Sequence, residues 1–143
     1  MFRGFLERAG LVSPSAPAQP AYQHPARVPT QQTWILNEAK SVVLDSSGNG
    51  TVKIGPAKAS ERWRVRTVAV STSTAVKVPV ASVYTGFLAP GNLLGGTYTG
   101  SNDSDDVDVT LGPGSFLTVA WQGGDAGATA TVSVYGDRLV KTL

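Results

Sequence analysis

From residue 34 onward, apolar and polar residues alternate in short runs that are separated by glycine-rich turns. The run ERWRVRTVAV places Trp63, Val65 and Thr67 on one face of an extended chain and three arginines on the other. This two-residue period is typical of a half-buried β-strand. Turn signals recur about every ten residues, as in a domain built of short strands.

The same reading predicts about eight strands and no helix in this region. The expected strands span 41–45, 50–54, 61–70, 75–84, 92–99, 106–111, 115–121 and 128–135. The first two flank Ser46-Ser47-Gly48-Asn49 and predict a hairpin, and Pro79 within the fourth predicts an edge strand or a bulge. We therefore expect an all-β fold, a single β-sandwich or jelly-roll-like domain over residues 34–143.

The N-terminus follows a different pattern, which predicts a short amphipathic helix over residues 1–12. Phe2, Phe5, Leu6 and Ala9 have the spacing of one helix face, and Leu11 continues the apolar run. A helix of this length is marginal in water and needs its apolar face covered. Exposed phenylalanines favour aggregation, so we interpret these five residues as an anchor that binds a groove on a partner, with a disordered terminus as the alternative.

Residues 13–33 are predicted to form an extended, proline-rich linker between this helix and the β domain. Five of the nine prolines lie there, among alanine, glutamine and serine. Such a composition cannot build a core and favours extended, polyproline-like backbone. The linker and the helix together make an extended N-terminal arm.

Composition excludes several classes of site. The chain has no cysteine, so disulfides, zinc–thiolate sites and cysteine nucleophiles are absent. A net charge of +2 is too small to indicate a nucleic-acid or anionic membrane partner. No apolar run approaches the ~18 residues of a membrane-spanning helix, and we predict neither partner.

Arg62, Arg64 and Arg66 are expected on one face of a single strand. Guanidinium groups aligned in this way suit bidentate contacts to carboxylates or phosphates. A solvated face is the simplest interpretation, and a protein interface is the alternative. A nucleic-acid groove would add interleaved aromatic residues, whereas Trp63 falls on the opposite face.

The acidic stretch SNDSDDVDV predicts a turn whose charges discourage edge-to-edge aggregation. Asp103, Asp105 and Asp106 are weak candidates for calcium ligands. The spacing does not match an EF-hand loop, because Val107 occupies a ligand position. We predict no metal and no cofactor.

Catalysis is not expected. The only histidine, His24, lies in the linker, where nothing orients it as a general base. The aromatic residues Trp63, Trp121, Tyr84 and Tyr98 could form a sugar-stacking platform, but the two tryptophans sit at inward positions of strand runs, which indicates core. We predict a protein that is not an enzyme.

Three runs carry a resemblance to a known class of proteins. They are GTVKIGPAKASERWRVRTVAVSTST, VASVYTGFLAPGNLLGGTYTGSNDSDD and LGPGSFLTVAWQGGDAGATATVSVYG. Over residues ~50–136, their amino-acid sequence resembles that of small structural proteins of tailed phages that infect actinobacteria. The shared features are a GTYTG-like turn before an aspartate segment, a Pro-Gly before the next strand and a W-x-GGDxGAxAT segment. The resemblance implies a virion component and carries over no catalytic residue.

Together, these observations predict a capsid decoration or minor capsid protein. Its arm would dock on the major capsid protein or another virion protein, or on a neighbouring copy in a homo-oligomer such as a trimer. The resemblance implies a virion location, with assembly in the cytoplasm of the bacterial host. The alternative is a tail, neck or fibre-associated module for host recognition, which would bind cell-wall glycan through loop aromatics and Asp125.

Overall fold

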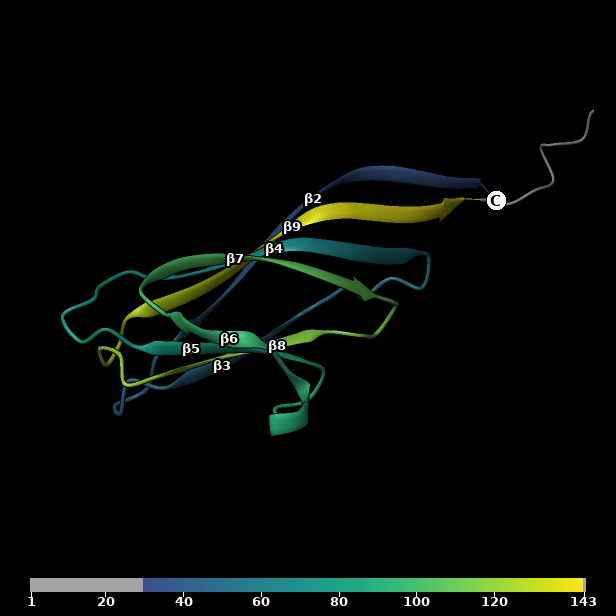
Figure 1. Ribbon diagram of the computed structural model, residues 1–143. Helices are drawn as coiled ribbons and strands as arrows, with labels where there is room; N and C mark the ends of the chain where they lie inside the picture. Colours follow the sequence, from purple (N-terminus) through teal and green to yellow (C-terminus); the bar gives the residue numbers. More distant parts are fainter. Residues whose placement is uncertain (1–29, 143) are drawn as a thin grey trace, which may run out of the picture. The chain divides into compact units, whose positions relative to one another are not determined.

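Eight strands form two four-stranded antiparallel sheets in the computed structural model, which describes residues 30–142. Figure 1 shows the sheets as two layers. The first sheet has the order β2 (Thr30–Val43), β9 (Thr129–Thr142), β4 (Glu61–Thr72), β7 (Asn102–Leu111). The second has the order β3 (Gly50–Ile54), β8 (Leu117–Gln122), β5 (Val80–Thr85), β6 (Leu93–Thr99).

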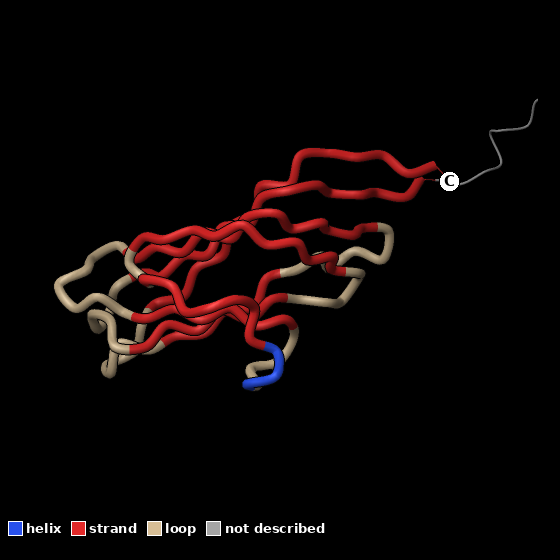
Figure 2. Tube along the Cα trace, viewed as in Figure 1, coloured by secondary structure: helices blue, strands red, loops and turns tan. Residues whose placement is uncertain are grey.

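The described residues contain almost no helix, which confirms the all-β prediction (Figure 2). The exception is the single 3₁₀ turn η2 (Pro90–Asn92), in which proline begins the turn. Within residues 30–142, no helix has the length and apolar character needed to span a membrane.

The strands pair in a nested order. β5 pairs with β6, β4 with β7, β3 with β8, and β2 with β9. Each successive pair therefore encloses the one before it in sequence, so most of the sheet contacts join residues far apart in the chain. Contacts of this kind are slow to form, because the intervening loop must be ordered first.

The buried side chains of both sheets form one hydrophobic cluster. Trp63 of β4 and Trp121 of β8 are 5% and 1% exposed, so their interpretation as core residues is confirmed. The indole nitrogen of Trp121 donates a hydrogen bond of 3.1 Å to the carbonyl of Gly100, which satisfies its one polar atom. The two sheets thus share a core to which each contributes one of these tryptophans.

The alternation along β4 changes phase at Arg66. Val65 pairs with Gly136 of β9, and the next paired residue is Thr67, opposite Tyr135. Arg66 is therefore an extra residue, a β-bulge, and a one-residue insertion exchanges the two faces of a strand. Beyond it the buried positions are Val68 and Val70 rather than Thr67, so the predicted placement of Thr67 on the same face as Trp63 and Val65 was wrong.

The predicted hairpin at residues 41–54 is also wrong. β2 lies in the first sheet and β3 in the second, so the turn between them connects the layers and does not close a two-stranded ribbon. Asp45 shapes this turn by accepting hydrogen bonds from the backbone of Ser47 and Asn49. The sequence correctly predicts a turn at these residues, but a turn does not determine which strands pair.

Two further boundaries differ from the prediction. The fourth expected strand begins at Val80, directly after Pro79, because proline has no N–H to donate to a neighbouring strand. β5 lies between β8 and β6, so it is not an edge strand. The acidic stretch predicted as a turn is instead the start of β7, which begins at Asn102.

The described residues belong almost entirely to one compact unit, Gln32–Val140. β2 begins at Thr30, four residues before the expected start of the β domain at Trp34. The predicted helix at 1–12 and most of the linker at 13–33 lie outside the residues that the structure describes.

Gly136→Ala is expected to destabilise the protein by about 2–4 kcal/mol, because the bulge leaves no room for a side chain. A Cβ atom at this position would lie 2.0 Å from the carbonyl oxygen of Arg64, and φ is +158°. Gly96→Ala in β6 is the matched control, since a Cβ there meets nothing within 4 Å. Urea denaturation of both variants measures the effect, and equal stabilities would contradict the bulge.

Candidate functional site

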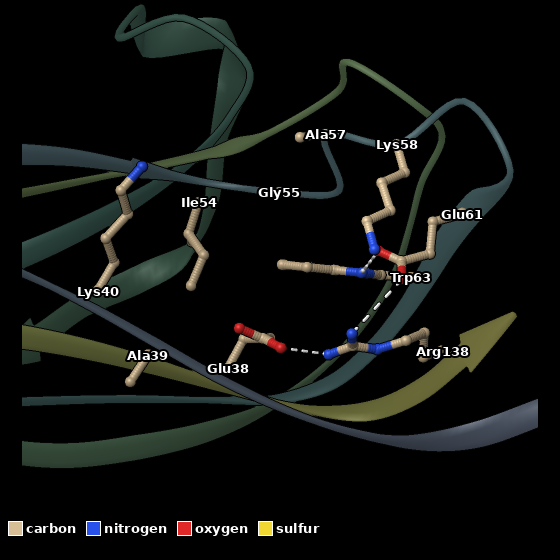
Figure 3. Close-up of a pocket in the computed structure, with 10 residues that line it drawn as sticks. All are labelled: Glu38, Ala39, Lys40, Ile54, Gly55, Ala57, Lys58, Glu61, Trp63 and Arg138. Carbon is tan, nitrogen blue, oxygen red and sulfur yellow. Dashed lines mark hydrogen bonds and ion pairs between the residues drawn. The ribbon is translucent and has the colours of Figure 1, made fainter. Parts of the chain in front are cut away.

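A cavity of about 290 Å³ lies between the two sheets at one end of the strands, and charged side chains line it (Figure 3). Glu38 and Lys40 come from β2, Glu61 and Trp63 from β4, and Arg138 from β9. Ile54, Gly55, Ala57 and Lys58 form the wall on the side of β3. Side chains of both sheets therefore meet here.

Arg138 is the centre of this site. Its guanidinium contacts a carboxylate oxygen of Glu38 through Nη2 and one of Glu61 through Nη1, the latter at 3.5 Å. The guanidinium carbon also lies 5.8 Å from the centre of the Trp63 ring, within the range of a cation–π contact. Arginine suits this position because its planar fork can bind two carboxylates and contact an aromatic ring at once.

Glu61 is the most deeply buried charged residue described, at 9% exposed. Its Oε1 accepts a hydrogen bond of 3.3 Å from the indole nitrogen of Trp63, and its Oε2 contacts Arg138. A buried carboxylate needs such partners, because losing water would otherwise cost several kcal/mol. The Nε of Arg138 is buried and has no hydrogen-bond partner among the described residues.

Glu38, Glu61 and Arg138 are not among the site residues predicted from the sequence. One signal was present, because Glu61 shares the two-residue period of Trp63 and Val65 and is therefore placed inward. Its partner Arg138 lies 77 residues away, so no local pattern could have predicted the ion pair.

The arginine stripe is largely neutralised within the molecule. Arg64 binds Asp108 of β7 at 3.3 Å, and Arg66 binds Asp137 of β9 at 2.8 Å. Arg62 forms no ion pair with any described residue. The three side chains lie on the outward face of β4, but they do not form an open cationic row, because two of them are paired with aspartates.

The structure separates the acidic candidates. Asp103 and Asp105 pair with the buried residues Val70 and Val68, so they lie toward the core side at the margin of the sheet. Asp106 lies on the other face, where it accepts a hydrogen bond of 3.3 Å from Thr67. Over residues 30–142, no group of three or more metal-binding side chains is placed to hold an ion.

Tyr98 is buried beside the aspartates. It is 4% exposed, and its hydroxyl has no hydrogen-bond partner among the described atoms. Burial, and then the negative charges of Asp105 and Asp103, raise the pKa of Tyr98. With Trp63, Trp121 and Tyr98 in the core, only Tyr84 of the four aromatic candidates is partly accessible.

Asp125 is fully engaged in holding the loop between β4 and β5. One carboxylate oxygen accepts hydrogen bonds from the hydroxyl of Thr74 and the backbone of Val76, and the other accepts one from the backbone of Lys77, at 2.8–3.0 Å. The bond from Lys77, followed by those from Val76 and Thr74, lowers the pKa of Asp125. These contacts give Asp125 a structural role.

The proposed anchor residues Phe2, Phe5, Leu6, Ala9 and Leu11 lie outside the described residues. Their role stays a prediction. No protein-family model, no curated protein and no solved structure matches this chain.

Arg138→Met is expected to lower the free energy of unfolding by about 3 kcal/mol, because it leaves Glu61 buried without its cation. The double variant Arg138→Met/Glu61→Gln should recover much of that loss. Arg66→Met is the matched control, since the more exposed Arg66–Asp137 pair should contribute less than about 1 kcal/mol. Chemical denaturation measures all three, and equal losses for Arg138→Met and Arg66→Met would contradict the buried cluster.

Asp125→Asn is expected to destabilise the protein in a pH-dependent way. Because the folded pKa of Asp125 lies below its ordinary value, the ionised carboxylate contributes stability above the ordinary aspartate pKa. That contribution is lost as the pH falls through the lowered folded pKa. The melting temperatures of the wild type and of Asp125→Asn, measured from neutral to strongly acidic pH, should therefore converge at low pH. A difference in melting temperature that stays constant with pH would contradict this assignment.

Proposed function

We propose that this protein is a non-enzymatic structural component of a phage virion, a decoration or minor capsid protein built on a jelly-roll sandwich. The strand order carries the proposal. Two sheets ordered β2-β9-β4-β7 and β3-β8-β5-β6, with nested pairs, fit a long hairpin folded into a two-layer jelly roll. Jelly rolls occur in viral capsid and lectin domains, among others.

Fold by itself supports a function only by analogy. Three sequence runs resemble structural proteins of tailed phages. Among the functions that jelly-roll proteins perform, this resemblance favours that of a virion component. The charged side chains of the cavity agree with a structural role, because the carboxylates of Glu38 and Glu61 both bind the guanidinium of Arg138. Such a cluster is suited to holding β2, β4 and β9 together at this end of the strands.

In the proposed mechanism, the N-terminal arm attaches the β domain to the assembled shell. Phe2, Phe5 and Leu6 would enter an apolar groove on the major capsid protein or a neighbouring copy. Each large apolar side chain buried there would contribute roughly 1.5–3 kcal/mol. Many copies on one lattice would make weak individual docking sufficient, provided that the copies touch.

The alternative is a glycan-binding module on a tail, neck or fibre. Among the described residues, Trp34, Phe87 and Tyr135 are 57%, 69% and 40% exposed and favour it, because stacking on a sugar needs an accessible ring. Trp63 and Trp121 do not support the glycan-binding alternative, because both side chains are buried. Asp125, its expected polar contact, has both carboxylate oxygens bound within the loop.

Co-sedimentation with purified capsids that lack this protein tests the proposal. The full chain should pellet with the capsids, and a chain without residues 1–33 should stay in solution, because the arm supplies the attachment. A chain with Phe2→Ser and Phe5→Ser is the matched control, which keeps the length of the arm and removes its apolar face. If the full chain does not pellet, the capsid proposal fails; if all three pellet equally, the anchor role of the arm fails.

A further inference from the structure

Two opposite margins of the sheets carry opposite charge. The first sheet ends in β2 on one side and β7 on the other, and the second ends in β3 and β6. Lys40 of β2 and Lys53 of β3 line one cavity of about 230 Å³, so these two strands share a margin. β6 and β7 share the other margin, where Asp105 lies beside Gly95.

The margin formed by β2 and β3 carries unpaired lysines, and we call it the basic edge. Lys40 of β2, Lys53 of β3 and Lys58 of the loop that follows β3 are all exposed, and none forms an ion pair with a described residue. The acids nearby are already engaged, since Glu38 and Glu61 bind Arg138. The ammonium of Lys53 also lies 4.9 Å from the ring centre of Phe116 and 5.2 Å from that of Phe87, so two aromatic rings flank the cation.

The margin formed by β6 and β7 carries the aspartates, and we call it the acidic edge. Asp105 and Asp106 are exposed, and neither forms an ion pair with a described residue. No lysine or arginine occurs between Lys77 and Arg138 in the sequence, so β5, η2, β6 and β7 carry no positive charge of their own. Only Asp108 is neutralised, by Arg64 of β4.

We propose that the acidic edge of one copy docks against the basic edge of a second copy, so that the β domains associate side by side. Charge complementarity identifies the occupant, because these lysines and aspartates form no ion pair with the described residues of their own copy and would form ion pairs with the next copy. Both margins are also edge strands, whose unpaired N–H and C=O groups can continue a sheet into another chain. The contact is head to tail, which closes into a ring when the rotation permits.

A different role for the same charges makes the opposite prediction. Charges on edge strands commonly keep copies apart, which is the role predicted from the sequence for the aspartates. In that case, neutralising the aspartates would cause association. If the two edges bind each other, neutralising the aspartates removes association instead.

Sedimentation velocity and light scattering of the full chain test this inference without any capsid, so its outcome is separate from that of the proposed function. At micromolar concentration the protein should form a discrete oligomer that dissociates as salt rises from about 0.05 M to about 0.5 M. Asp105→Lys/Asp106→Lys and Lys40→Glu/Lys53→Glu should each weaken association by at least about tenfold, because like charges then meet. Lys77→Glu, outside both edges, should not.

Two combinations make the test specific to the contact. The four-change chain with both edges reversed should regain the oligomer, because the pairs are restored with exchanged signs. The two reversed variants, mixed in equal amounts, should associate with each other although neither does so alone. Circular dichroism confirms that each variant is folded. A monomeric wild type, or an oligomer that survives both reversals, would overturn the inference, as would association caused by Asp105→Asn/Asp106→Asn.

Discussion

The extra residue at Arg66 determines how β4, an inner strand of the first sheet, pairs with β9 and which of its side chains reach the core. Before the bulge, β4 buries Trp63 and Val65; after it, β4 buries Val68 and Val70. Without the change of phase, the second half of β4 would turn its valines to solvent. The bulge depends on Gly136, since any side chain there would meet the backbone of Arg64. One glycine therefore keeps both halves of a long strand in a common core.

The same region places the charged side chains. On the outer face, Arg64 and Arg66 bind aspartates of β7 and β9, one on each side of β4. On the inner face, Arg138 joins Glu38 of β2 to Glu61 of β4. Most of the arginine charge is thus used to connect neighbouring strands, whereas three lysines on the margin of β2 and β3 form no ion pair with a described residue. That division of roles underlies the proposed association of copies.

The sequence predicts the strands far better than their pairing. Alternation and turn residues located most of the strands within a few positions, and they placed Trp63 and Trp121 in the core, because these signals act over a few residues. The Arg66 bulge needs a glycine on another strand, 70 positions along the chain, and the buried pair of Glu61 and Arg138 joins residues 77 apart. The hairpin predicted at residues 41–54 failed for the same reason, since a local turn is compatible with strands in one sheet or in two.

The proposed function depends on the protein being a regular part of the particle, and quantitative mass spectrometry of purified virions tests this most directly. Measured against the major capsid protein, a decoration or minor capsid protein should be present in a fixed, large number of copies that survives repeated purification. A handful of copies per particle would indicate the tail or fibre alternative. Absence from intact virions would contradict a structural role altogether.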